Sequence, residues 1–324
     1  MSENKVSVLV PIYNVSFYIE RCAHSLFGQT FKEIEFIFVD DCTPDDSIEK
    51  LTSILALYPE RTHSVKIIKH ETNKGISAAR QTAFDLASCD YLLAMDSDDY
   101  IEPDMIELLY KKAVETDADM VYCSYFSEFG NNKTILSKND FVDDKLGLLD
   151  KAIQGHSSYW NKLIARKIIV DNNIRTLDGI DHGDDLSVIA KIIYHSQKFS
   201  FVEKPLYHYV QYNVNSTTKK FKPKYIEDRL RLVADLEQFF MNKEDYAFFE
   251  PSVLLLKALR KIRLLRLTNG AKTYMKIYPE INTHINMLDI SFFSKRILIS
   301  ASKNQMVQIK ILFILSKLKT KFFH

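Results

Sequence analysis

The chain has 324 residues, a net charge of +1, and 46% hydrophobic and 12% aromatic residues. This length is too great for one ordinary core and suits two domains, while the apolar content excludes a disordered chain. The near-zero charge excludes a protein that attracts nucleic acid through its overall charge, so nucleic acid is not an expected partner.

Segments typical of strands alternate with segments typical of helices in the first 130 residues. Five strands are expected, at "VSVLVPIY" (6–13), "EFIFVDD" (35–41), "VKIIKH" (65–70), "YLLAMD" (91–96) and "DMVYCSYFSEF" (119–129). In the helical stretch that follows the second strand, Thr43 or Asp45 is expected to cap the helix, with Pro44 near its start. Such alternation predicts βαβ units and an α/β fold with a mainly parallel, doubly wound sheet.

The chain changes character after its middle. Residues 130–215 combine short strands, helices and loops, whereas long amphipathic helices begin near residue 222. We therefore predict an α/β domain over residues 1–218 and a mostly helical C-terminal domain over residues 219–324.

Polar side chains follow the predicted strands where each strand ends. They are Tyr13, Asp40, Asp41, Asp96 and Asp98. The carboxyl ends of parallel strands meet at one edge of a sheet, and ligands bind there in doubly wound folds. We therefore expect a binding site at this edge.

The stretch "LLAMDSDDYIEP" (92–103) crowds carboxylates that repel one another, which a cation would relieve. An Asp-x-Asp at a strand end offers hard oxygen ligands suited to Mg²⁺ or Mn²⁺. The sequence has no G-x-G-x-x-G or P-loop pattern, so a bound nucleoside diphosphate would need such a cation to neutralise its phosphates. The alternative is an acidic helix start, in which Asp99 or Asp104 interacts with the helix dipole.

Four motifs occur in a fixed order: "VSVLVPIYNVSFYIERCAHSLFGQT", "FIFVDDCTPDDS", "NKGISAARQTAFDLASCDYLLAMDSDDYI" and "HGDDLSV". Together they resemble the family-2 glycosyltransferases over roughly residues 5–215. The resemblance implies a GT-A fold and an inverting enzyme that uses a nucleotide-sugar, expected to be a UDP-sugar, with Mn²⁺ or Mg²⁺. The expected acceptor is a hydroxyl of a glycan or lipid-linked saccharide, and the expected role is surface polysaccharide biosynthesis.

The resemblance also assigns roles to residues. Those implied to line the nucleotide site are Pro11, Tyr13, Asp40, Asp41, Asn73, Gly75, Arg80, Asp96 and Ser97. Within this set, Asp41 is expected to accept a hydrogen bond from the uracil ring. One departure is Cys42, which stands where many relatives have glycine.

The metal and the catalytic base are implied in the same way. Asp98 is expected to be the principal metal ligand, with Asp96 close to ribose or metal and His208 completing the shell. Asp184 and Asp185 match the acidic pair, and Asp185 matches the general base. The alternatives are a helix N-cap for the acidic pair and a packed aromatic-strand residue for His208.

Two other classes of function stay open on the sequence. One is a non-catalytic module that binds a nucleotide-sugar or glycan beside an active enzyme. The other is a nucleotidyltransferase, although the glycine-rich phosphate loop that it would need is missing.

The C-terminal segment is basic. After Asp289 no acidic residue follows, and the cationic residues are Lys295, Arg296, Lys303, Lys310, Lys317, Lys319 and Lys321. Such a stretch is typical either of a helix that lies on an anionic membrane or of a helix packed on its domain with lysines in water. The earlier segment "LLLKALRKIRLLRL" repeats the pattern.

The expected location is the cytoplasm, with peripheral contact at the inner face of the plasma membrane as a further expectation. The N-terminus does not resemble a signal peptide, and no apolar run approaches the roughly 20 residues of a membrane span. The four cysteines are scattered, which is typical of reduced thiols.

Overall fold

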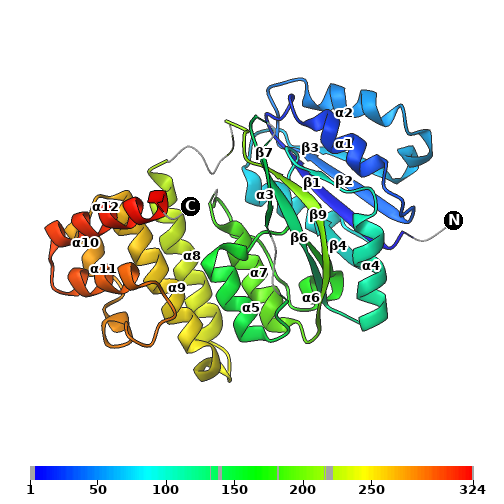
Figure 1. The fold of residues 1–324 in the computed structure, drawn as a ribbon. Coiled ribbons are helices and arrows are strands. Elements are labelled where there is room, and N and C mark those ends of the chain that lie inside the picture. Colours follow the sequence, from blue (N-terminus) through cyan, green and yellow to red (C-terminus); the bar gives the residue numbers. More distant parts are fainter. Residues whose placement is uncertain are drawn as a thin grey trace. The chain divides into compact units, whose positions relative to one another are not determined.

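The chain folds into two compact units; in Figure 1 the first runs from blue to yellow-green, and the second from yellow-green to red together with the short green segment Leu149–His156. The computed structural model describes residues 4–131, 133–137, 141–180, 182–214, 216 and 222–322. The first unit consists of Met1–Leu148 and Ser157–Lys222, and the second of Leu149–His156 and Pro223–His324. The chain therefore crosses between the units three times, whereas the sequence predicted one boundary near residue 218.

The first unit is built on a sheet of nine strands among the described residues. Their bounds are β1 Val6–Ile12, β2 Ile34–Asp40, β3 Val65–Lys69, β4 Tyr91–Ala94, β5 Tyr100–Ile101, β6 Met120–Phe129, β7 Lys133–Ser137, β8 Lys162–Ala165 and β9 Phe199–Val210. The order is β3-β2-β1-β4-β8-β6-β9-β5, with β7 paired to β6. The strands β3, β2, β1 and β4 run parallel, and β8 is antiparallel to both β4 and β6.

Helices cover this sheet on both faces. In the first unit they are α1 Ile19–Phe27, α2 Ser47–Leu55, α3 Ile76–Leu86, α4 Met105–Thr116, α6 Arg166–Asp171 and α7 Asp184–His195, with a 3₁₀ turn at Pro59–Ser64. One further helix, α5 Lys145–Lys151, runs from the first unit into the second. The strand β1 is buried throughout because α1 and α4 pack on one face and α3 on the other.

The predicted cap of the second helix is wrong in position. Helix α2 begins at Ser47, after Pro44 rather than around it. Asp45 accepts hydrogen bonds from the backbone N–H and hydroxyl of Ser47, and Thr43 donates to Asp45. These side chains fold the loop at the end of β2 instead of continuing the helix.

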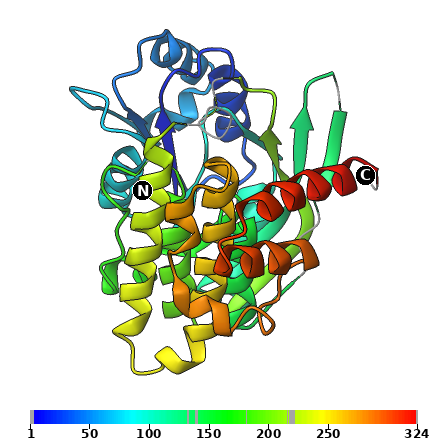
Figure 2. The same ribbon diagram turned by 90° about the vertical axis from the view of Figure 1, so that its left-hand side faces the viewer.

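The second unit is helical. Its elements are a π-helical turn Ala152–His156, α8 Lys224–Met241, α9 Tyr246–Leu267, α10 Lys272–Met275, a 3₁₀ turn Pro279–Thr283, α11 Phe292–Ser302 and α12 Met306–Phe322. Helix α9 lies between α8 and the pair α11 and α12, and these last two lie side by side (Figures 1 and 2). Among the described helices, none combines the length and apolar character that a membrane-spanning helix needs.

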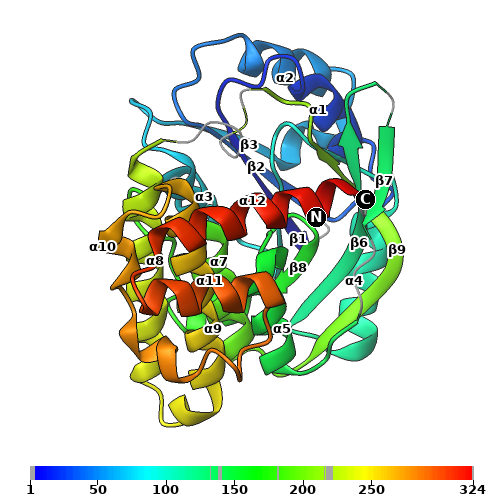
Figure 3. The same cartoon turned by 60° about the vertical axis from the view of Figure 1, so that its left-hand side comes forward.

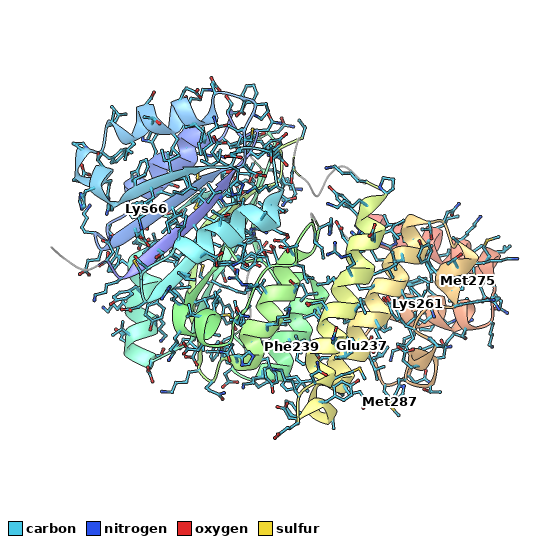
Figure 4. All side chains as sticks on the ribbon, turned by 180° about the vertical axis from the view of Figure 1, so that it is seen from behind. Lys66, Glu237, Phe239, Lys261, Met275 and Met287 are labelled. Atoms are coloured by element: carbon cyan, nitrogen blue, oxygen red, sulfur yellow. The ribbon has the colours of Figure 1, made fainter. Side chains whose placement is uncertain are left out.

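Two lysines of α9 are buried, which corrects one sequence expectation. Lys257 forms ion pairs with Glu237 of α8 and Glu280, and Lys261 donates to the backbone carbonyl of Ile277 at 2.7 Å. Figure 4 labels Glu237 and Lys261 between the helices of this unit. The lysines in "LLLKALRKIRLLRL" therefore hold the helices together and do not form a cationic surface.

Candidate functional site

Three parallel strands end at the same edge of the sheet and bring the predicted polar residues together. Ile12 at the end of β1 is paired with Asp40 at the end of β2, and Leu9 of β1 is paired with Ala94 of β4. The segment Asp96–Asp99 therefore begins directly beside the end of β1. This arrangement follows from the parallel register, as the sequence predicted.

Arg80 of α3 is the centre of the site. Its guanidinium lies 2.7 Å from Asp96 Oδ1, 2.5 Å from Asp184 Oδ2 and 2.6 Å from Asp185 Oδ1. The same guanidinium lies over the ring of Tyr159, 4.9 Å from its centroid. Arg80 thus joins an acid of the Asp-x-Asp motif to the acidic pair more than eighty residues further along the chain. The sequence assigned Arg80 to the nucleotide site but did not predict this junction.

Backbone geometry fixes where the acidic pair lies. Gly183 has a φ of 93°, which favours glycine, and it is the N-cap residue of α7. No side chain caps this helix in the described part of the chain. Asp184 and Asp185 therefore occupy the first turn, where the helix dipole favours negative charge.

The segment ahead of α7 is attached to α3. Ser77 donates to the carbonyl of Ile180 at 2.5 Å, and the Thr176 hydroxyl donates to the carbonyl of Ser77 at 2.9 Å. The Thr176 backbone N–H also donates to Gln81 at 2.9 Å. Since Arg80 lies on the same helix, α3 sets the distance between its guanidinium and both acids.

The pKa of the Asp185 carboxyl is raised. Burial raises the pKa of Asp185 to about 8; Arg80 opposes this effect, and Asp184 and Asp96 add to it. Burial also lowers the pKa of nearby Lys162 to about 8. A carboxylate with a raised pKa accepts a proton more readily than an exposed one, which suits general-base catalysis near neutral pH.

Each acid of the "DSDD" segment has its own partner. Asp96 pairs with Arg80, Asp98 accepts a hydrogen bond from the Asn213 amide at 2.8 Å, and Asp99 accepts from the Tyr207 hydroxyl at 2.5 Å and from the Val210 backbone N–H at 2.7 Å. Asp99 is fully buried and attaches this loop to β9. Asp99 does not start a helix, whereas Asp104, the other residue of the alternative, is the N-cap residue of α4, although its side chain makes no capping hydrogen bond.

Asp98 and Asp96 fit a divalent cation. Burial and the neighbouring Asp96 raise the pKa of Asp98 to about 6. The raised pKa means that the negative form of this carboxylate is poorly stabilised, and a bound cation would stabilise it. Asp96 is partly exposed, whereas Ser97 between them is buried. In the described part of the chain, no group of three or more His, Cys, Asp and Glu side chains is arranged around a metal position. Mg²⁺ typically takes one or two protein carboxylates and completes its shell with water and phosphate.

The structure does not place His208 as a metal ligand. Its Nδ1 lies 2.8 Å from Glu128 and its Nε2 lies 2.8 Å from Glu102, so both ring nitrogens face carboxylates. Its ring stacks between Tyr100 at 4.1 Å and Phe126 at 4.9 Å. We correct the sequence assignment because a ligand nitrogen needs a free lone pair directed at the metal.

The predicted nucleoside residues lie at the ends of β1 and β2. Pro11 is buried within β1, and Tyr13 just beyond it is about half exposed. Asp40 accepts the Thr43 backbone N–H at 2.7 Å, its one side-chain hydrogen bond among the described residues.

Asp41 is more strongly engaged than Asp40. Asp41 accepts the backbone N–H groups of Lys74 and Gly75, each at 2.8 Å, and its Oδ1 lies 2.7 Å from His70 Nδ1. Gly75 has a φ of 88° at the start of α3, and Asn73 two residues earlier is exposed. The predicted uracil contact of Asp41 is not tested by this geometry and stays a prediction.

Three residues that position the site lie outside the sequence motifs and were not predicted. Tyr159 packs on Arg80, Asn213 holds Asp98, and His70 holds Asp41. His70 directly follows β3 at the same sheet edge as the acids, so the strand-end rule would have found it. Tyr159 and Asn213 lie far from their partners in sequence, and only the fold brings them together.

Comparison with known proteins decides the family. Residues 7–173 match the model of glycosyl transferase family 2. The chain belongs to glycosyl transferase family 2. The protein named "Putative glycosyltransferase EpsH" of Bacillus subtilis (strain 168) is 31% identical over 245 residues, which cover 72% of this chain and 68% of that protein. The protein is therefore a glycosyltransferase, and the reading as a non-catalytic module is set aside.

Solved structures show the same fold. The crystal structure of residues 1–349 of TarS from S. aureus in complex with UDP-GlcNAc has a TM-score of 0.73 and 20% identity, covering 97% of this chain and 92% of that chain. A mannosyltransferase from Pyrobaculum calidifontis in complex with GDP-Man and Mn²⁺ has a TM-score of 0.52 and 14% identity, covering 99% and 88%. The fold is thus GT-A, as the sequence predicted.

Proposed function

We propose that this glycosyltransferase transfers a sugar from a UDP-sugar to a hydroxyl of a glycan or lipid-linked acceptor, with inversion, in the assembly of a surface polysaccharide. The observation that carries the proposal is the Arg80 junction, which joins Asp96 to the acidic pair Asp184 and Asp185. A donor that reaches Asp96 would therefore lie close to a base. The UDP-GlcNAc complex of TarS supports the choice of nucleotide.

Asp185 is the base in this mechanism. Its raised pKa allows the carboxylate to take the proton of the acceptor hydroxyl as the oxygen attacks the anomeric carbon. One base and one in-line attack invert the anomeric configuration without a covalent intermediate. Arg80 holds the side chains of Asp184 and Asp185 in place through its ion pairs with both carboxylates.

The donor's diphosphate would be held with a divalent cation at Asp98, with Asp96 beside it. When bound, such a cation supplies Lewis-acid stabilisation of the UDP leaving group. The chain's own part is to present these carboxylates: Asn213 orients Asp98, and Asp99 ties the loop to β9 through Tyr207. Mn²⁺ and Mg²⁺ both suit this ligand set.

Calorimetric titration of UDP in the presence of Mn²⁺ and then of EDTA tests the donor site. Binding is expected with Mn²⁺, with strong weakening in EDTA and in Asp98→Asn. The matched control is Asp104→Asn, because Asp104 pairs with Lys204 outside the site and should leave binding unchanged. UDP binding that is equally strong in EDTA and in Asp98→Asn would refute the metal-assisted donor site.

A second variant separates chemistry from binding. Asp185→Asn is expected to keep UDP affinity within a few-fold and to lower kcat by roughly 10²–10⁴-fold, the usual contribution of a general base. Asp85→Asn is the control, since Asp85 is an exposed residue of α3 that pairs with Arg175. Wild-type turnover in Asp185→Asn would remove Asp185 from the role of base.

A further inference from the structure

Helix α12 carries an exposed apolar face. Val307, Ile311, Ile314 and Leu315 are 69%, 50%, 60% and 45% exposed. Their spacing of four, three and one residues places them on one side of a helix. The opposite side is occupied by Ile309, Leu312 and Phe313, which are buried. Helix α12 is therefore apolar on two sides, and among the described residues of the helical unit only the side with Ile309, Leu312 and Phe313 is buried.

The inner side of α12 explains its position within the helical unit. Phe313 lies under the guanidinium of Arg266 of α9, 5.2 Å from the ring centroid, and α12 packs along α11. Figure 3 shows α11 and α12 running side by side. Since this packing is satisfied by Ile309, Leu312 and Phe313, it gives no reason for aliphatic residues on the outer side.

The segment that contains α11 and α12 carries charge of one sign. From residue 290 to the end the chain has six lysines, one arginine and no aspartate or glutamate. Lys303 and Arg296 are exposed, Lys310 is partly exposed, and α11 adds the exposed ring of Phe292. Lys317, Lys319 and Lys321 belong to the same helix, although the side chains beyond Ser316 lie outside the described part of the chain, as does Phe323.

We propose that the outer face of α12, formed by Val307, Ile311, Ile314 and Leu315, docks on an anionic lipid bilayer surface. The aliphatic residues would enter the boundary between headgroups and acyl chains, and the surrounding lysines and arginine would meet the anionic headgroups. Charge complementarity selects this occupant, because a segment without any acidic residue matches a negative surface and repels a second copy of itself. This inference does not depend on the identity of the donor or on the catalytic base.

Vesicle co-sedimentation of the full chain tests the proposal. The probes are phosphatidylcholine vesicles with and without about 30% phosphatidylglycerol, at about 0.1 M salt where surface charges are only partly screened. The full chain is expected to bind the anionic vesicles and to bind neutral vesicles at least tenfold more weakly. Equal binding to both vesicles, or binding to neither, would overturn the proposal.

A triple variant, Val307→Gln with Ile311→Gln and Ile314→Gln, keeps the charge and replaces exposed residues with helix-forming ones. It is expected to lower the vesicle partition coefficient at least tenfold, because three aliphatic side chains no longer enter the bilayer. The matched control is Leu57→Gln with Val114→Gln, residues of the first unit that are 66% and 56% exposed, and it should bind as the wild type does.

Two more measurements separate the proposal from its competitors. The fluorescence emission of the Leu315→Trp variant should shift to the blue when anionic vesicles are added. The shift should be larger than that of the wild-type chain, whose single tryptophan is Trp160. Sedimentation velocity without lipid would show a dimer if the face binds a second copy. A dimer that the triple variant abolishes, together with unchanged vesicle binding, would assign this face to self-association and overturn the lipid proposal.

Discussion

Asp185, the base in the proposed mechanism, shows how neighbouring charges set the pKa of one carboxylate in a site crowded with acids. Burial raises its pKa to about 8, while Arg80 at 2.6 Å limits the rise. The charge of Arg80 is divided among three carboxylates, so it does not fully offset the desolvation of any one of them. A base of this kind is protonated for part of the time at neutral pH.

This pKa leads to a prediction about the pH dependence of turnover. A base works when it is deprotonated, so kcat/KM should rise about tenfold per pH unit below pH 8 and level off above it, because kcat/KM reports the free enzyme. The measurement is the rate of UDP release against pH, with donor and acceptor both well below their KM values so that the free enzyme is the form that titrates. The affinity for UDP at each pH is the control, since it identifies any change that comes from donor binding. A rate that is constant or falls between pH 6.5 and 9 would contradict a base with this pKa.

Cys42 gives a second prediction at the scale of one residue. Its φ of 57° lies in the left-handed region, which costs a non-glycine residue about 1 kcal/mol or more. Cys42→Gly should therefore leave the free energy of unfolding unchanged or raise it by up to about 1 kcal/mol. The gain is limited because glycine is more flexible in the unfolded chain and loses more conformational entropy on folding. Cys42→Val should lower it by about 1–2 kcal/mol, because a branched side chain is worse in this region.

Chemical denaturation of these variants provides the measurement. Cys42→Ala is the control, because it removes the thiol and keeps the backbone penalty, so its stability should equal that of the wild type within about 0.5 kcal/mol. If Cys42→Val is as stable as Cys42→Gly, the backbone at this position does not have the conformation described.

At the scale of elements, the site depends on three elements that meet at one guanidinium. Arg80 belongs to α3, Asp96 follows β4, and Asp184 begins α7. Both Arg80 and Asp184 are buried. A buried charge that loses its partner is costly, whereas an exposed ion pair contributes little. Arg80 should therefore stabilise the fold as well as organise the site.

Arg80→Leu is expected to lower the free energy of unfolding by about 3 kcal/mol, because it leaves Asp184 buried without its cation. Adding Asp184→Asn should recover part of the loss, since no uncompensated charge then remains at that position. The control is Arg175→Leu, which removes an exposed partner of Asp85 and should cost no more than about 1 kcal/mol. Urea denaturation measures all three variants, and equal costs for Arg80→Leu and Arg175→Leu would show that the junction does not stabilise the fold.

The elements also show what the sequence could predict. The parallel strands β1, β2 and β4 were predictable because each is a mostly apolar run of four to seven residues followed by polar side chains, and β3, which contains two lysines, was predictable from its β-branched residues. His208 was not predictable, because its sequence neighbours are aromatic and its two carboxylate partners, Glu102 and Glu128, come from other parts of the chain. Helix α2 started later than expected because Asp45 bonds locally to Ser47.

At the scale of the whole molecule, the chain passes between the two units three times, whereas two domains joined by one linker would need a single passage. The segment Leu149–His156 belongs to the helical unit although it lies inside the first unit in sequence. Ala152 and Ile153 are buried, and Asp150 accepts a hydrogen bond from Ser252 of α9 at 2.5 Å. No periodicity distinguishes these eight residues, so the sequence alone predicted a single boundary near residue 218.

This arrangement predicts that the segment Leu149–His156, which continues α5 of the first unit, needs α9 to stay folded. A fragment of residues 1–222 keeps Asp98, Arg80 and Asp185, but Leu149, Ala152 and Ile153 lose the apolar surface that covers them. Exposing these side chains should cost about 2 kcal/mol or more and lower the Tm by about 5 °C.

The fragment of residues 1–304 is the control, because it lacks α12 and retains α9. Thermal unfolding followed by circular dichroism should place the 1–222 fragment below the 1–304 fragment. If both melt at the temperature of the full chain, the segment Leu149–His156 does not need α9, and a single boundary after residue 218 would describe the protein better.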